Sequence, residues 1–236
     1  MVTTVGILLQ SSFAATNSVS VETENATLSA GGKAALVSDV GASGGSAIQF
    51  GAAELPVDTG TCEVPTAQQL QDLDRDASEI NTWPKVANEK VAVYFETSQI
   101  DAEFTGYMEQ GAELWNESPC VSLRVVPSCP AGANCVTATM SDEISGNTVG
   151  RCTLSRSSST GSITNGTIII FSERLANSSS NGKLVTTTHE MGHCIGLMAH
   201  RLTERVLMSP TSYNDTPATP DAIDFQNLLV LYGEKI

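Results

Sequence analysis

The residues best suited to metal chemistry in this chain are its histidines, and all three lie close together. They are His189, His193 and His200, in the stretch TTTHEMGHCIGLMAH. Histidine is the commonest metal-ligating side chain in proteins. His189 and His193 are four residues apart, so on a helix they share one face, one turn apart. Two imidazoles in that arrangement can bind a single zinc ion.

Glu190 follows the first histidine and is the candidate general base. A zinc ion lowers the pKa of a water molecule that it binds to about 7, and a neighbouring carboxylate can accept the proton. The motif HExxH therefore predicts metal-assisted hydrolysis with Glu190 as the catalytic residue. The same short pattern also arises by chance on amphipathic helices, so the residues that follow it have to support the interpretation.

The third histidine can join the site only if the helix ends. On a continuing helix, His200 would lie about 10 Å beyond His193 along the axis, which is too far to share a metal ion. Gly196 stands between the two histidines. Glycine adopts left-handed conformations without a steric penalty, so it is suited to a turn at this point. We expect the helix to end near Gly196 and the returning chain to bring His200 to the metal.

The pattern HExxHxxGxx, followed by a ligand and a methionine, resembles the metzincin zinc metallopeptidases, and among them the matrixins and snapalysins. Met208 in VLMSP is similar to the methionine of their Met-turn. The resemblance covers about residues 84–233. It implies a secreted zinc endopeptidase that binds extended protein or peptide segments along an edge strand and prefers a moderately apolar P1′ residue. It also implies that Pro210 and Tyr213 form the wall of the S1′ pocket.

The sequence departs from this family at the third ligand. Metzincins place that ligand three residues after the glycine, where this chain has Ala199, and His200 is one residue later. We interpret the difference as a one-residue insertion, because the spacing from His200 to Met208 is matrixin-like. Glu204 and Asp215 are the alternative third ligands. With Glu204 as ligand, the chain would be a different zinc hydrolase.

Six cysteines favour an exported protein, because disulfides persist in oxidising compartments. Cys129 and Cys135 flank the tight loop CPAGANC and are expected to pair. Cys120 and Cys152 are candidates for a second disulfide. Cys194 lies inside the HExxH helix and is expected to be a buried thiol that packs in the core.

Cys62 has two interpretations. The stretch GTCEVP is similar to the Cys-Gly-x-Pro motif by which matrixins stay latent, with a thiolate of the pro-segment on the zinc ion, although Glu63 replaces the glycine. The resemblance therefore implies a cysteine switch, and with it a zymogen. The alternative is a disulfide from Cys62 to Cys120 or Cys152.

Composition restricts the other function classes. A chain of 236 residues that is 41% hydrophobic can form one good-sized core. Its 26 acidic and 12 basic residues give a net charge of −14, which argues against nucleic acids and anionic membrane surfaces as partners. No apolar run approaches the roughly 20 residues of a membrane span. We expect a monomer without a membrane span.

The chain divides into three expected regions. Residues 1–15 have the short apolar core and small residues typical of a signal-peptide remnant. Residues 16–82 are expected to be a β-rich part or pro-segment with a linker, and 16–60 resemble the opening strands of carbohydrate-binding β-sandwich modules. That resemblance implies contact with a cell wall or polysaccharide. It leaves one alternative function, a non-catalytic surface-binding protein on a metzincin scaffold, against which the intact Glu190 argues.

Residues 83–236 form the expected catalytic domain, of the α/β or α+β class. The resemblance implies a metzincin-like zincin, with a twisted mixed sheet, an active-site helix and a closing C-terminal helix. Strands are expected at 90–96, 121–126, 134–141, 148–154 and 167–173, and helices at 101–118, 184–197 and 221–233. The Asp-rich loops are candidates for a structural Ca²⁺, although none of them shows a characteristic ligand spacing.

Overall fold

The computed structural model describes residues 20–21, 34–38, 46–50, 60–65, 68–74, 82–143 and 146–236. The chain forms two compact units, Met1–Val57 and Asp58–Ile236. The first unit contains a three-stranded antiparallel sheet of order β1-β3-β2, with β1 at Ser20–Val21, β2 at Ala34–Ser38 and β3 at Ser46–Phe50. These strands lie in the region expected to be β-rich. The candidate signal-peptide remnant lies outside the described residues.

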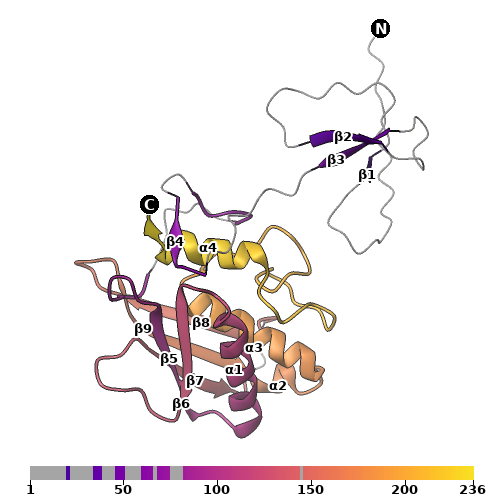
Figure 1. Ribbon diagram of the computed structural model, residues 1–236. Coiled ribbons are helices and arrows are strands. Elements are labelled where there is room, and N and C mark those ends of the chain that lie inside the picture. The colour runs from indigo at the N-terminus through magenta and orange to yellow at the C-terminus, as the bar shows by residue number, and fades with distance from the viewer. Residues whose placement is uncertain are drawn as a thin grey trace. The chain divides into compact units, whose positions relative to one another are not determined.

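The second unit is built on a five-stranded mixed sheet of order β6-β5-β7-β9-β8 (Figure 1). Its strands are β5 (Val91–Gln99), β6 (Val121–Val126), β7 (Cys135–Ser141), β8 (Gly150–Arg156) and β9 (Ile163–Phe171). Four of them run parallel, and β8 pairs antiparallel with β9 at one edge. Apolar side chains alternate along β5, where Val91, Val93 and Phe95 are buried. This period of two is what a strand with one face on the core requires.

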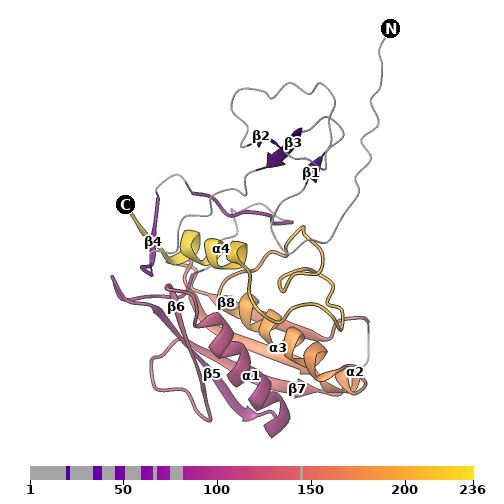
Figure 2. The same ribbon diagram turned by 45° about the vertical axis from the view of Figure 1, so that its right-hand side comes forward.

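Two helices lie side by side on the sheet (Figure 2). Helix α1, Ala102–Trp115, begins where the Asp101 side chain accepts a hydrogen bond from the Phe104 backbone. Helix α3, Ser180–Cys194, contacts α1, β8 and β9. The short helix α2, Ser172–Leu175, follows β9. Within the described part of the chain, no helix is both long and apolar enough to cross a membrane.

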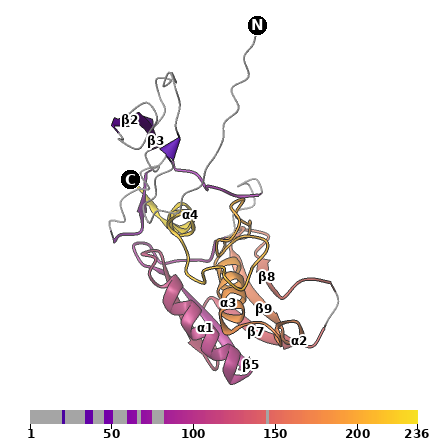
Figure 3. The same ribbon diagram turned by 90° about the vertical axis from the view of Figure 1, so that its right-hand side faces the viewer.

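The C-terminal helix α4, Ala222–Tyr232, closes the unit (Figure 3) and contacts strand β4, Glu63–Val64. It begins with a capping box in which Asp221 and Asp224 satisfy each other's backbone N–H groups. At its other end, the Tyr232 hydroxyl donates to the Ile195 carbonyl at 2.7 Å. The Trp83 indole nitrogen donates to the Cys194 carbonyl at 2.8 Å. Helix α4 and the first residues of the expected catalytic domain therefore both hold the end of α3.

The second unit begins at Asp58, earlier than the expected boundary at residue 83. Strand β4, Glu63–Val64, pairs in parallel with β10, Glu234–Lys235, near the C-terminus. A disulfide joins Cys62 to Cys120, which lies immediately before β6. The described residues between 60 and 74 are therefore part of the same compact unit as α3, rather than a separate linker.

The structure contains three disulfides: Cys62–Cys120, Cys129–Cys135 and Cys152–Cys194. The predicted pairing across the loop at 129–135 is confirmed. The predicted Cys120–Cys152 pairing is wrong, because Cys120 directly precedes β6 and Cys152 lies in β8, and these strands are at opposite edges of the sheet. The prediction that Cys194 is a buried thiol is also wrong, since β8 crosses the end of α3 and brings Cys152 to it.

The predicted cysteine switch is wrong as well. The Cys62 sulfur is bonded to Cys120, so it offers no thiolate to a metal ion. The alternative interpretation of Cys62, a disulfide to Cys120, is confirmed.

Candidate metal centre

Helix α3 provides the first two histidines. It begins at Ser179, whose side chain accepts a hydrogen bond from the Gly182 backbone. His189 and His193 lie one turn apart on the helix, and their ring centroids are 4.5 Å apart. Both side chains are buried, with 9% and 8% of their surface exposed. The predicted helical pairing of the two imidazoles is therefore present in the structure.

Backbone carbonyls fix the orientation of both rings. His189 Nδ1 lies 2.7 Å from the Leu207 carbonyl oxygen, and His193 Nδ1 lies 2.7 Å from the Leu197 carbonyl oxygen. A carbonyl oxygen can only accept, so each Nδ1 carries the proton and each Nε2 is left unprotonated. The neutral imidazole with an available Nε2 is the form that ligates a metal ion.

The chain turns back after Cys194, as predicted. Gly196 has φ of +110°, in the region that only glycine adopts without strain. Its N–H bonds to the His193 carbonyl at 3.0 Å, and the Leu197 N–H bonds to the Gly192 carbonyl at 3.1 Å. These bonds end the helix and direct the chain towards His200.

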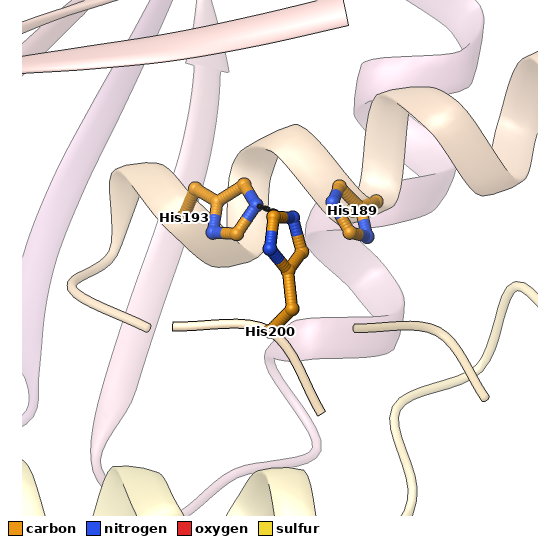
Figure 4. Close-up of side chains that lie close together, drawn as sticks. All are labelled: His189, His193 and His200. Atoms are coloured by element: carbon orange, nitrogen blue, oxygen red, sulfur yellow. Dashed lines mark hydrogen bonds between the residues drawn. The ribbon is translucent and has the colours of Figure 1, made fainter. Parts of the chain in front are cut away.

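The returning segment places His200 opposite α3 (Figure 4). Its Nε2 lies 3.2 Å from His193 Nε2. One ligand atom from each of the three histidines lies within 4.8 Å of those of the other two. Two nitrogens that each lie about 2.0–2.1 Å from one tetrahedral zinc ion are about 3.3 Å apart, so the donor set and its spacing fit zinc.

Burial changes the protonation of the site in the absence of a metal ion. Desolvation lowers the pKa of His189 to about 4, against the opposing effect of the Leu207 carbonyl. Desolvation also raises the pKa of Glu190 to about 7, although a hydrogen bond from the Cys152 backbone and the charge of Arg151 oppose the rise. His189 is therefore neutral at pH 7, which is the protonation state of a ligand.

A cavity of about 620 Å³ lies beside the histidines and Glu190. Residues 147–152, on and before β8, and residues 209–212 both contribute to its lining. Pro210 contributes to this lining. Tyr213 does not, because its ring lies under the Arg205 guanidinium, 4.6 Å from ring centroid to Cζ. Thr211 and Ser212 occupy the wall in its place, and no sequence motif singled them out.

Met208 is buried beneath α3. A Cβ atom added at Gly192 would lie 2.5 Å from the Met208 sulfur and 2.7 Å from the Trp115 ring. The Met208 carbonyl accepts a hydrogen bond from the Arg201 N–H at 2.8 Å. Met208 thus packs against α3 between His189 and His193. Its carbonyl is hydrogen-bonded to Arg201, the residue after His200.

The alternative third ligands lie outside this cluster. Both carboxylate oxygens of Asp215 bond to Arg205, at 2.8 and 2.9 Å. Glu204 is exposed and does not belong to the histidine group. Among residues whose positions are described, the other group of potential ligands is Glu96 with Cys129 and Cys135. Its sulfurs form a disulfide, so it offers neither thiolates nor the oxygen-rich set that calcium prefers.

Sequence reasoning also missed Asp74, which lies beside His200. The Asp74 carboxylate accepts a hydrogen bond from the His200 backbone at 3.0 Å, and its second oxygen lies 3.6 Å from His200 Nδ1. Asp74 belongs to the acidic stretch DLDRD, which has no recognisable motif. The two residues are 126 positions apart, so only the folded chain shows their proximity.

Comparison of the chain with models of known protein families and with curated protein sequences found no match. The metzincin resemblance gains no support from these comparisons. An assignment of function therefore depends on the geometry of the site.

Proposed function

We propose that this protein is a secreted zinc-dependent endopeptidase of the metzincin type, with matrixin-like or snapalysin-like features. The observation that supports this most directly is the convergence of three imidazoles beside a buried carboxylate, Glu190, at an open cavity. An α/β sheet with an antiparallel edge strand, a ligand-bearing helix and a closing helix is consistent with the metzincin arrangement. Three disulfides are typical of an extracellular protein.

His189, His193 and His200 would hold the zinc ion. An all-nitrogen set of three imidazoles is a common catalytic zinc set, which leaves a coordination position for water or substrate. When bound, zinc supplies Lewis-acid activation of a water molecule and polarisation of the scissile carbonyl.

Glu190 performs the proton transfers. Its carboxylate accepts the proton of the attacking water and then gives it to the nitrogen of the leaving amine. The Cys152 backbone N–H bonds to this carboxylate, so strand β8 orients the base. Burial beneath β8 also excludes bulk water from the carboxylate.

Strand β8 would orient the substrate. It pairs with β9 on one side, and its residues 150–152 line the cavity. An extended peptide can pair with the backbone of such an edge strand, which aligns the scissile bond with the three histidines. Pro210, Thr211 and Ser212 also line the cavity and would bound the P1′ side chain, for which the resemblance implies moderate apolarity.

The test is hydrolysis of casein, and of a mixed peptide library, by the full-chain protein loaded with zinc. We expect cleavage by the wild type, loss of cleavage in Glu190→Ala with zinc still bound, and loss of zinc in His200→Ala. Asp215→Ala is the matched control and should retain zinc. A wild type that binds zinc but cleaves neither substrate would contradict the proposal and favour the non-catalytic surface-binding protein.

A further inference from the structure

A short segment that precedes β5 in the chain, residues 71–74, lies along residues 200–203. We call residues 71–74 the strap. Leu73 and Arg201 form an antiparallel bridge between the two segments. The first residue of the strap exchanges two hydrogen bonds with Asn227 of α4, at 2.8 and 3.1 Å. The strap is therefore joined both to the turn that carries the third histidine and to the closing helix.

Asp74, at the end of the strap, holds His200 through backbone and side chain. Its N–H bonds to the His200 carbonyl at 2.9 Å, and its Oδ1 accepts from the His200 N–H at 3.0 Å. Its Oδ2 lies 3.6 Å from His200 Nδ1, within ion-pair range. On the opposite edge of the same imidazole, Nε2 faces the Nε2 atom of His193. The ring is thus held between a carboxylate on one side and the ligand cluster on the other.

A buried ion-pair network fixes the position of the strap. Arg201 is 2% exposed, and its Nε donates to Asp72 Oδ2 at 2.6 Å. Its Nη1 donates to Asp221 at 2.8 Å and to Asp224 at 2.9 Å, both at the start of α4. A guanidinium buried among carboxylates is held strongly in place, because loss of any partner leaves a charge uncompensated. These ion pairs therefore hold the strap, with the carboxylates of Asp72 and Asp74, in place beside residues 200–203.

We infer that Asp74 is a positioning residue for His200, the third ligand. This inference rests on the proposed function, since it concerns the same metal centre. A carboxylate on the Nδ1 side of a ligating imidazole fixes the orientation of the ring and raises the basicity of Nε2. It also accounts for the departure at Ala199, because the strap holds the longer turn in a shape that still delivers His200. The strap consequently stays with the active protein, and any removable pro-segment ends before residue 71.

The experiment measures zinc affinity of the full-chain protein by competition with a chelator, and the melting temperature of each metal-free variant. Asp74→Asn keeps an acceptor for the His200 N–H but removes the charge, and Asp74→Glu restores the charge. We expect zinc binding to weaken about 10- to 100-fold in Asp74→Asn and to recover most of this loss in Asp74→Glu. Glu204→Gln removes one exposed charge from the same turn and is the matched control, with affinity unchanged.

Cobalt(II) provides a second readout. Its visible absorption bands report the coordination of the metal, and we expect them to shift in Asp74→Asn but not in Glu204→Gln. Wild-type zinc affinity in Asp74→Asn, or an equal loss in Glu204→Gln, would overturn the inference and leave the proposed function intact. A metal-free Asp74→Asn protein that melts well below the wild type would show a general structural role and overturn it too. Failure of the wild type to bind zinc would overturn both proposals.

Discussion

The backbone of Gly150 lies directly against the side chain of Glu190. A Cβ atom at position 150 would stand 2.7 Å from Glu190 Cγ and 2.9 Å from its Oε1. Real Cβ atoms do not approach other atoms so closely, so the carboxylate keeps its place only because residue 150 lacks a side chain. The edge strand β8 and the side chain of the candidate general base are thus in direct contact.

Replacement of Gly150 by alanine should therefore impair catalysis more than metal binding. The added methyl group displaces either Glu190 or strand β8, and small displacements of a catalytic group are costly. We expect kcat/KM for casein-derived peptides to fall at least ~10-fold, while zinc affinity stays within about twofold. Gly106→Ala is the control, since a Cβ at position 106 of α1 meets nothing within 4 Å. Unchanged kcat/KM in Gly150→Ala would mean that this contact does not place the base.

Removal of the Cys152–Cys194 disulfide should reduce both stability and activity. The bond closes a loop between residues 42 positions apart and joins β8 to the end of α3, next to the Cys152 N–H that bonds to Glu190. We expect the double serine variant to lose about 4 kcal/mol of unfolding free energy, measured by denaturant titration, and much of its activity.

The matched control for that variant is removal of the local Cys129–Cys135 disulfide, with a separation of only 6 residues. Its shorter loop predicts a loss of about 2 kcal/mol, and its distance from Glu190 in the fold predicts unchanged activity. Equal activity losses in the two double variants would argue against a specific role for the bond at Cys152.

The pH dependence of stability in the metal-free protein should report Glu190. Burial raises its folded-state pKa to about 7, above the ordinary value of 4.5. A carboxyl group with a raised folded pKa favours the folded state fully below pH 4.5, and this contribution is lost as the pH rises through 7. Between these pH values the wild type should therefore lose up to ~3 kcal/mol relative to Glu190→Gln. Parallel stability curves for the two proteins, measured by urea unfolding, would contradict the prediction.

Loss of the Arg201 guanidinium should destabilise the second unit strongly. Arg201→Met leaves Asp224, which is 1% exposed, without its cation, and breaking a buried ion pair costs about 3–5 kcal/mol. Arg205→Gln is the control, because its pair with Asp215 has side chains 58% and 74% exposed and is worth about 0–1 kcal/mol. Thermal unfolding of both variants in the metal-free state measures the difference. Similar melting temperatures would show that the strap does not depend on the buried network.

Local features of the candidate site could be predicted from the sequence because each depends on neighbouring residues. The four-residue spacing of His189 and His193 sets their common helix face, whatever surrounds them. Gly196 turns the chain because glycine alone adopts its positive φ freely. The Cys129–Cys135 disulfide follows from a loop too short to separate its ends. The same reasoning gave the five strands of the main sheet, α1 and α4 to within about four residues of their observed bounds.

Contacts between distant segments could not be predicted from the sequence, because they depend on the order of the strands in the sheet. No local sequence pattern indicates that order. The placement of β6 and β8 at opposite edges of the sheet decided that Cys62 pairs with Cys120 and that Cys152 pairs with Cys194.

The sequence by itself determined that His189 and His193 share a helix face and that the chain turns after them, because helical periodicity and glycine conformation are properties of a few adjacent residues. Only the tertiary structure decided that His200, rather than Glu204 or Asp215, lies beside these two histidines, and how His200 is held. Asp74 and His200 are separated by more than half of the chain, and the buried charge of Arg201 brings their segments together. Long-range pairs of this kind are selected by the free energy of the whole packed unit, in which each buried charge must find its partners.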